Sequence, residues 1–365
     1  MNLKNLRNKL ILSLLLGMLV IVGFMAYGDF SDIWTRLGDF RWELLPILLF
    51  LSLANYLIRF VKWHFYLNHI GIHDVPKSDS FLAFFSGLGM VITPGKMGEW
   101  LKSYLLQEMR GIPFLRTAPI LIAERFTDAV ALLLLAVAGL IMFGEAWEIF
   151  IAVAVLSVLA VVVARHRPTM RAILHVAERA PLISRFARQL EDFYESTYIL
   201  FSPWSLIFTI ALSLVSWAGE ALAFYLVLVG LGYDGSWTLL VQAAFILPIA
   251  TLAGAVVLIA PGGLGIAEGG ITGLLQVIVE GMTKSTATLA ALIIRFTTLW
   301  FGVIVGLITF AFVTRRLARA ASVAESTALP QNSPKDTAQT GGRPAATAVD
   351  GPATIAGLDE ADGPS

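Results

Sequence analysis

Residues 239–268 read LLVQAAFILPIATLAGAVVLIAPGGLGIAE, which is 22 uncharged and mainly apolar residues followed by Pro261, Gly262 and Gly263. The hydrocarbon core of a bilayer is about 30 Å thick and a helix rises about 1.5 Å per residue, so about 20 apolar residues cross it. Proline lacks the amide that a helix needs, and glycine tolerates a break. The stretch therefore predicts a transmembrane helix followed by a helix break.

The whole chain has the composition of an integral membrane protein. Of its 365 residues, 57% are hydrophobic and 14% are charged. The mean hydropathy is +0.77. So few charged side chains do not cover a water-facing surface, which excludes a soluble enzyme. The net charge of zero gives no support for a nucleic-acid partner, and the absence of cysteine excludes disulfides and cysteine nucleophiles.

Further apolar runs predict the rest of the fold. Those of spanning length are residues 10–27, 44–67, 118–143, 149–164, 206–231, 239–260 and 287–313. Two shorter runs, 81–93 and 266–279, adjoin Pro94-Gly95 and Pro261-Gly262-Gly263, which predicts re-entrant or broken helices. We expect an all-α polytopic membrane protein with about seven or eight transmembrane helices and two re-entrant or broken helices.

Charge and composition predict the orientation and the division of the chain. Arginines fill residues 165–188 and follow the last run at Arg315, Arg316 and Arg319, and the N-terminus is basic, so these parts should be cytoplasmic. We expect an N-terminal anchor helix with an external loop (1–43), a first membrane repeat (44–164), a cytoplasmic amphipathic linker (165–203), a second membrane repeat (204–316) and a disordered cytoplasmic tail (317–365).

An internal repeat links the two membrane parts. PGKMGE at 94–99 resembles PGGLG at 261–265, and Arg125-Phe126-Thr127 recurs as Arg295-Phe296-Thr297. The predicted orientation makes the two repeats inverted, so their breaks should enter from opposite faces and approach each other near the midplane. The alternative is that proline and glycine simply end helices at the surface.

Many ionisable residues fall within the predicted spans and breaks, where each costs about 2.5 to 3.5 kcal/mol at the bilayer centre unless it has a partner or a cavity. They are Arg59, Lys62, Lys96, Glu99, Glu124, Arg125, Asp128, Glu220, Glu268 and Arg295. We predict an anionic headgroup site in which cations and flexible backbone bind the ligand, formed by Lys96, Arg125, Arg295, Gly262, Gly263 and Gly265. Acidic residues should orient these cations or couple transport: Glu99, Glu124, Asp128 and Glu268.

The alternative interpretation is that these charges form buried ion pairs that only hold helices together. No catalytic residue, cofactor or metal site is predicted. His64, His69 and His73 lie near one predicted helix end and are interpreted as interfacial side chains.

Three strings together resemble the lysylphosphatidylglycerol synthase transmembrane-region family, whose members are also called flippase-like membrane proteins. They are PGKMGE at 94–99, ERFTD at 124–128 and PGGLGIAE at 261–268, with Arg295 in the last span. The resemblance covers roughly residues 10–316. It implies a module that translocates or binds a membrane phospholipid, without the aminoacyl-transfer domain of fused members, and therefore not an enzyme.

The resemblance also implies the cytoplasmic membrane of a prokaryote, with both termini cytoplasmic. A homo-oligomer or a lipid-synthesis partner is left open, and no nucleic-acid partner is expected. Two other functions remain as alternatives. One is a membrane-embedded enzyme that modifies lipid headgroups, with Glu268 or Asp128 as general base, and the other is a scaffold for a separate lipid synthase.

Overall fold

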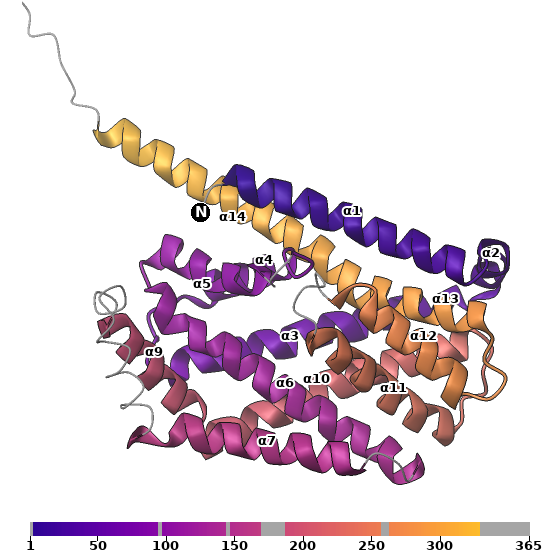
Figure 1. Cartoon of the computed structure of the whole chain (residues 1–365). Helices are drawn as coiled ribbons and strands as arrows, with labels where there is room; N and C mark the ends of the chain where they lie inside the picture. Colours follow the sequence, from indigo (N-terminus) through magenta and orange to yellow (C-terminus); the bar gives the residue numbers. More distant parts are fainter. Residues whose placement is uncertain (1–2, 94–96, 144–146, 169–186, 257–262, 329–365) are drawn as a thin grey trace, which may run out of the picture. The chain divides into compact units, whose positions relative to one another are not determined.

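The computed structural model describes residues 3–93, 97–143, 147–168, 187–256 and 263–328 (Figure 1). All regular secondary structure in these ranges is helical. The chain divides into two units, Met1–Ala320 and Ala321–Ser365. Of the helices in the described ranges, the first unit contains all but the end of the last one.

Helices cover each predicted apolar run at least in part. In the first half they are α1 (Leu3–Tyr27), α2 (Phe30–Asp39), the 3-10 turn η1 (Trp42–Leu44), α3 (Leu45–His69), α4 (Lys77–Leu88), α5 (Met97–Arg110), α6 (Phe114–Phe143) and α7 (Trp147–Arg165). In the second half they are α9 (Ala187–Leu200), α10 (Pro203–Gly230), α11 (Trp237–Val256), α12 (Ile266–Ile278), α13 (Lys284–Arg295), the π-helix η5 (Phe296–Trp300) and α14 (Phe301–Ala328). Helices α2, α5 and α9 lie outside the predicted runs.

Four helical segments in the described residues are long and apolar enough to cross a membrane. They are Trp42–His69, Pro203–Gly230, Trp237–Ala255 and Lys284–Arg319. Residues 14–27 of α1 and helix α2 meet at 95° and add a fifth if the bent pair is one span. The chain is thus an all-α, multi-pass membrane protein, whereas the predicted seven or eight spans are not confirmed.

The two short apolar segments lie beside helix breaks, as predicted. α4 and α5 pack against each other on either side of the first break, and α11 and α12 do so at the second (Figure 1). The break residues 94–96 and 257–262 are outside the described ranges. α12 begins after Gly265, whose φ of +85° suits glycine and not residues with a Cβ.

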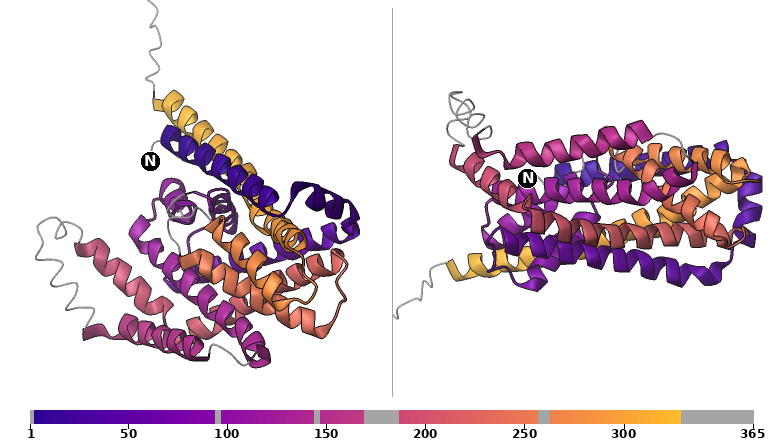
Figure 2. Two further views of the ribbon diagram at one scale, coloured as in Figure 1. Left: turned by 45° about the vertical axis from the view of Figure 1, so that its right-hand side comes forward. Right: turned by 90° about the horizontal axis from the view of Figure 1, so that it is seen from below.

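The buried apolar side chains form two main clusters that largely follow the two halves. One lies among α3, α4, α5 and α6 and includes Tyr66 and Ile120. The other lies among α10, α11, α12 and α13 and includes Phe224 and Ile294. α3 packs along α10 and α6 packs along α11, which joins the halves (Figure 2).

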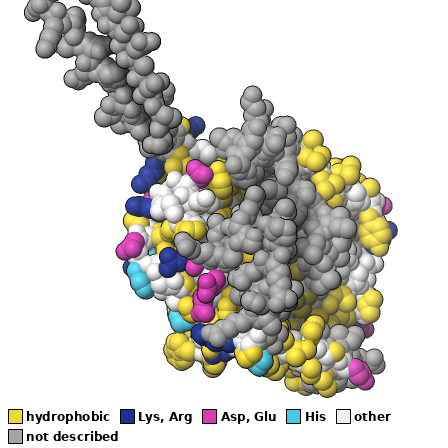
Figure 3. Space-filling view, turned by 60° about the vertical axis from the view of Figure 1, so that its left-hand side comes forward, with side chains coloured by type: hydrophobic (Ala, Val, Ile, Leu, Met, Phe, Trp, Pro, Cys, Tyr) yellow, Lys and Arg dark blue, Asp and Glu magenta, His cyan; other side chains and the backbone are white. Residues whose placement is uncertain are grey.

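The surface differs between regions of the molecule. On the face in Figure 3, many of the charged and histidine side chains gather toward one side, and apolar side chains dominate elsewhere in the part not covered by grey atoms. Large apolar residues of α1 and α7 are exposed, among them Leu19 at 68% and Val158 at 65%. Apolar exposure of this kind is expected where helices face lipid.

The C-terminal segment and the linker between the two halves differ in part from the predictions. Disorder was predicted from residue 317, but α14 continues to Ala328 because residues 317–328 contain helix-favouring alanine and arginine and neither glycine nor proline. Residues 329–365 lie outside the described ranges. In the predicted amphipathic linker, residues 187–200 form α9, and residues 169–186 are not described.

Candidate functional site

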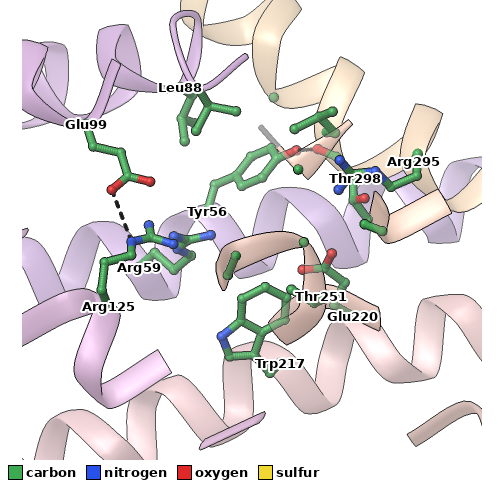
Figure 4. A pocket seen from close by; sticks show the side chains of 17 residues that line it. Tyr56, Arg59, Leu88, Glu99, Arg125, Trp217, Glu220, Thr251, Arg295 and Thr298 are labelled. Carbon is green, nitrogen blue, oxygen red and sulfur yellow. Dashed lines mark hydrogen bonds and ion pairs between the residues drawn. The ribbon is translucent and has the colours of Figure 1, made fainter. Parts of the chain in front are cut away.

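Residues next to both helix breaks line one cavity, which we call the charged cavity. Its volume is about 150 Å³, which is room for several water molecules (Figure 4). Glu99, which follows the first break, and Gly263, which follows the second, both line it. Described residues that follow each break therefore line the same space. Lys96 and Gly262, which were predicted to belong to the site, lie outside the described residues.

The described part of the charged cavity lining contains more basic than acidic side chains. The arginines are Arg59 of α3, Arg125 of α6 and Arg295 at the end of α13, and the acids are Glu99 of α5 and Glu220 of α10. Among the described lining residues, three positive and two negative side chains give a formal charge of +1. Both predicted arginines are thus present, together with a third.

The first of two Glu–Arg pairs connects α5 to α6. Arg125 Nε lies 3.1 Å from Glu99 Oε2, and the side chains are 35% and 8% exposed. Figure 4 marks this contact with a dashed line. Glu99 is in the first turn of α5, so the contact fixes the arginine of one helix against the start of the preceding one.

The second pair connects α12 to α13 in the same way. Arg295 Nε donates to Glu268 Oε1 at 2.6 Å, and the side chains are 15% and 3% exposed. Glu268 Oε2 also accepts a hydrogen bond of 2.6 Å from the Gly265 amide. Glu268 therefore caps the N-terminus of α12 and orients the arginine of the next helix.

Glu124 and Asp128 contact cations other than those predicted for them. Lys102 Nζ donates to Glu124 Oε2 at 2.5 Å. Lys62 Nζ donates to Asp128 Oδ1 at 2.5 Å, and Arg59 lies 3.5 Å from Asp128 Oδ2. Neither acid lines the charged cavity. Both hold basic side chains of α3 or α5 against α6.

Aromatic and polar side chains complete the cavity wall. The Tyr56 hydroxyl donates to the Thr298 carbonyl oxygen in η5. The Arg59 guanidinium carbon lies 5.9 Å from the ring centre of Trp217, within range of a cation–π interaction. Asn55 Nδ2 donates to Glu220 Oε2 at 2.8 Å, which connects α3 to α10.

Sequence reasoning recognised Arg59 and Glu220 as charges within spans but did not assign them to the site. A signal was available in α3, where Asn55, Arg59 and Lys62 are four and three residues apart and share one face of an apolar helix. Ser213 and Glu220 lie on a similar stripe of α10. Tyr56 and Trp217 carry no such signal, because aromatic residues are common in buried faces.

The predicted glycines have different surroundings. Gly263 lines the charged cavity with φ of +70°, and a Cβ there would lie 3.1 Å from the Gly254 carbonyl oxygen. Gly265 lies at a separate pocket between α1 and α12. Gly263 therefore permits close packing of α12 on α11, and of these two glycines only Gly263 lines the charged cavity.

The fold and the site define a multi-pass α-helical membrane protein whose broken helices border a cavity lined by arginines. The model of the family described as lysylphosphatidylglycerol synthase TM region matches residues 10–306, and the chain belongs to this family. The match includes both breaks and both Glu–Arg pairs, which confirms the resemblance. No curated protein matches the chain.

Proposed function

We propose that the protein translocates an anionic lipid headgroup between leaflets by binding it in the charged cavity. One observation carries this proposal: Arg125 and Arg295, from different halves of the chain, line the same cavity together with Arg59. A guanidinium is a planar fork that donates paired hydrogen bonds to a phosphate. A lining charge of +1 complements one negative charge on the ligand.

The acids support this role by orienting the arginines. Glu268 accepts a hydrogen bond from Arg295 Nε, which orients that guanidinium, and Glu99 forms an ion pair with Arg125 at 3.1 Å. Fixed donors bind a ligand with a smaller loss of side-chain entropy than mobile ones. The proposal therefore gives Glu99 and Glu268 an orienting role, and it gives Glu124 and Asp128 a structural role beside them.

The same proposal includes an inverted repeat with seven or eight crossings and cytoplasmic termini in a prokaryotic membrane. It is supported by the common order of elements and by the equivalent Glu–Arg pairs, since Glu99 and Glu268 are 169 residues apart and Arg125 and Arg295 are 170 apart. The basic residues after the last span support the orientation.

The alternative of a headgroup-modifying enzyme receives less support. Glu268 and Asp128, the candidate bases, are each 3% exposed, contact basic side chains and do not line the charged cavity. A general base has to reach the proton that it removes.

Liposomes with the full chain and a headgroup-labelled phosphatidylglycerol test the proposal. We expect exchange of the label between leaflets with the lipid chemically unchanged. Arg125→Gln should slow exchange by about tenfold or more, because it removes a charge-assisted hydrogen bond. The control Arg36→Gln alters an arginine of α2 that is 37% exposed and is not in the cavity lining, and it should behave as the unaltered protein.

The other outcomes contradict the proposal. A chemically altered lipid would indicate an enzyme, and neither exchange nor alteration would favour a scaffold. If Arg125→Gln yields protein that does not fold, as judged by size-exclusion chromatography, the charge acts as a structural ion pair. Arg125→Lys then separates a headgroup site from a structural ion pair, because it keeps the positive charge but removes the paired donors of the guanidinium. Folded protein with slow exchange would support the headgroup site, and folded protein with normal exchange would support the ion pair.

A further inference from the structure

A second cavity shares a lining residue with the charged cavity, and we call it the α1–α13 groove. Its volume is about 300 Å³, and its wall is mainly apolar, with contributions from α1, α2 and α13. Its lining includes Val20 and Ile21 of α1 and Leu289 and Leu292 of α13. In the described part of the chain, the charged side chains in its lining are Glu268 and Arg295.

Arg295 lines both the charged cavity and the α1–α13 groove. This side chain is 15% exposed and is fixed by its 2.6 Å hydrogen bond to Glu268. The charged cavity and the mainly apolar α1–α13 groove therefore share one lining side chain, and this side chain is positively charged. The arrangement fits a single amphiphile whose anionic group contacts Arg295 and whose hydrocarbon part lies on the apolar side.

α1 separates the groove from the exposed apolar surface. Its residues Leu19 and Val22 are 68% and 63% exposed, as expected for a helix that faces lipid. On its flank toward α12, α1 borders a further space of about 410 Å³ that Gly265, Gly269 and Gly273 line. With cavities on two flanks, α1 forms a side wall of the groove, and its outer face is exposed.

We propose that the α1–α13 groove holds an acyl chain of the lipid whose headgroup occupies the charged cavity. This inference rests on the proposed function and specifies its substrate as a whole acylated lipid and not a water-soluble phosphate. An acyl chain gains little by leaving the bilayer for another apolar space. The groove instead keeps that chain away from the polar cavity while the headgroup is bound there.

Photo-crosslinking tests the groove directly. The probe is phosphatidylglycerol with a diazirine on one acyl chain, in phosphatidylcholine liposomes that contain the full chain, and labelled sites are located by mass spectrometry. We expect labelling at Val20 and Leu292 that Arg295→Gln lowers by about tenfold, because the headgroup contact is lost. Arg36→Gln should leave it unchanged, and glycerol 3-phosphate should not compete as well as unlabelled phosphatidylglycerol.

Crosslinking by lipid that only surrounds the protein would give a different labelling pattern. Labelling confined to exposed side chains such as Leu19 and Val22, or groove labelling that Arg295→Gln does not change, would overturn the inference. Equal competition by glycerol 3-phosphate would also do so, because the acyl chain would then add nothing to binding.

Filling the groove gives a test that does not alter a charge. Leu292 is half-buried and lines the groove but not the charged cavity, whereas Val22 lines neither. Leu292→Trp should slow leaflet exchange by about tenfold or more, because the indole ring occupies part of the groove and even one extra methylene in an apolar pocket has effects of that order. Val22→Trp is the matched control on the exposed side and should have no effect.

The failures of the two proposals are distinguishable. If Arg125→Gln and Arg295→Gln leave exchange unchanged, the proposed function is wrong. If both abolish exchange while Leu292→Trp and Val22→Trp act alike, the headgroup site stands and the assignment of the groove is wrong.

Discussion

Glu99 and Glu268 occupy equivalent positions, each in the first turn of a helix that follows a break and each in contact with the Nε atom of an arginine. Sequence reasoning identified these residues because charge is costly inside a membrane. It did not identify which acid pairs with which base. For example, Glu124 pairs with Lys102 of α5 and not with one of the predicted site cations. Pairing is set by helix packing, which local sequence does not encode.

The two Glu–Arg pairs should differ in strength because they differ in burial. Glu268→Gln removes the charge that balances a mostly buried arginine, and we expect a loss of about 3 kcal/mol in stability. Glu99→Gln affects an arginine that is 35% exposed, so solvent screening should limit the loss to about 1 kcal/mol. Thermal denaturation in detergent measures both. Equal losses would show that burial does not control these pairs.

The Lys102–Glu124 pair should be structural. Neither residue lines the charged cavity, and both are buried. Lys102→Met leaves Glu124 as a buried charge and should cost about 3 to 5 kcal/mol, whereas the double variant Lys102→Met, Glu124→Met should recover much of that loss. The double variant should also keep leaflet exchange, and a large loss of exchange in well-folded double variant would place this pair in the mechanism.

At the scale of elements, the sequence predicted the apolar helices and the breaks better than the details of their ends. η5 is a π-helix directly after Arg295, and the Thr298 carbonyl within it accepts from Tyr56 of α3. A π-helix is often found at a functional site, but its formation depends on neighbouring helices. Its position was therefore not predictable from residues 296–300 alone.

The start of α12 gives a prediction about the second break. Gly263 has φ of +70° and little space, whereas Gly265 has φ of +85° and no heavy atom within 4 Å of a Cβ at its position. Gly265→Ala should cost about 1 to 2 kcal/mol for the backbone conformation alone. Gly263→Ala should cost more because its Cβ also meets the Gly254 carbonyl, and equal thermal stabilities would contradict the close packing of α11 on α12.

At the scale of the whole molecule, composition alone predicted an all-α membrane protein, because hydrophobic length decides whether a helix spans a bilayer. The number of crossings was less predictable, since α12 is too short for a simple span and the described part of α6 is not among the four candidate segments. The charged cavity was predicted in outline from the repeated strings. The α1–α13 groove was not, because it depends on how α1 packs.

The inverted repeat predicts opposite exposure of two equivalent connections. The chain has no cysteine, so single cysteines report without background. Ile112→Cys lies between α5 and α6, and Glu280→Cys lies between α12 and α13. An impermeant thiol reagent should label them from opposite sides of the membrane, and labelling from one side would contradict the inversion.

A double-mutant cycle on leaflet exchange tests most directly whether Arg125 and Arg295 bind one headgroup in one cavity. Exchange rates are measured for the unaltered chain, Arg125→Gln, Arg295→Gln and the double variant, all with unchanged folding by size-exclusion chromatography. We predict a coupling of about 0.5 to 3 kcal/mol, with the double variant much less impaired than the product of the single effects. Single effects that simply multiply, or that are absent, would contradict a shared site.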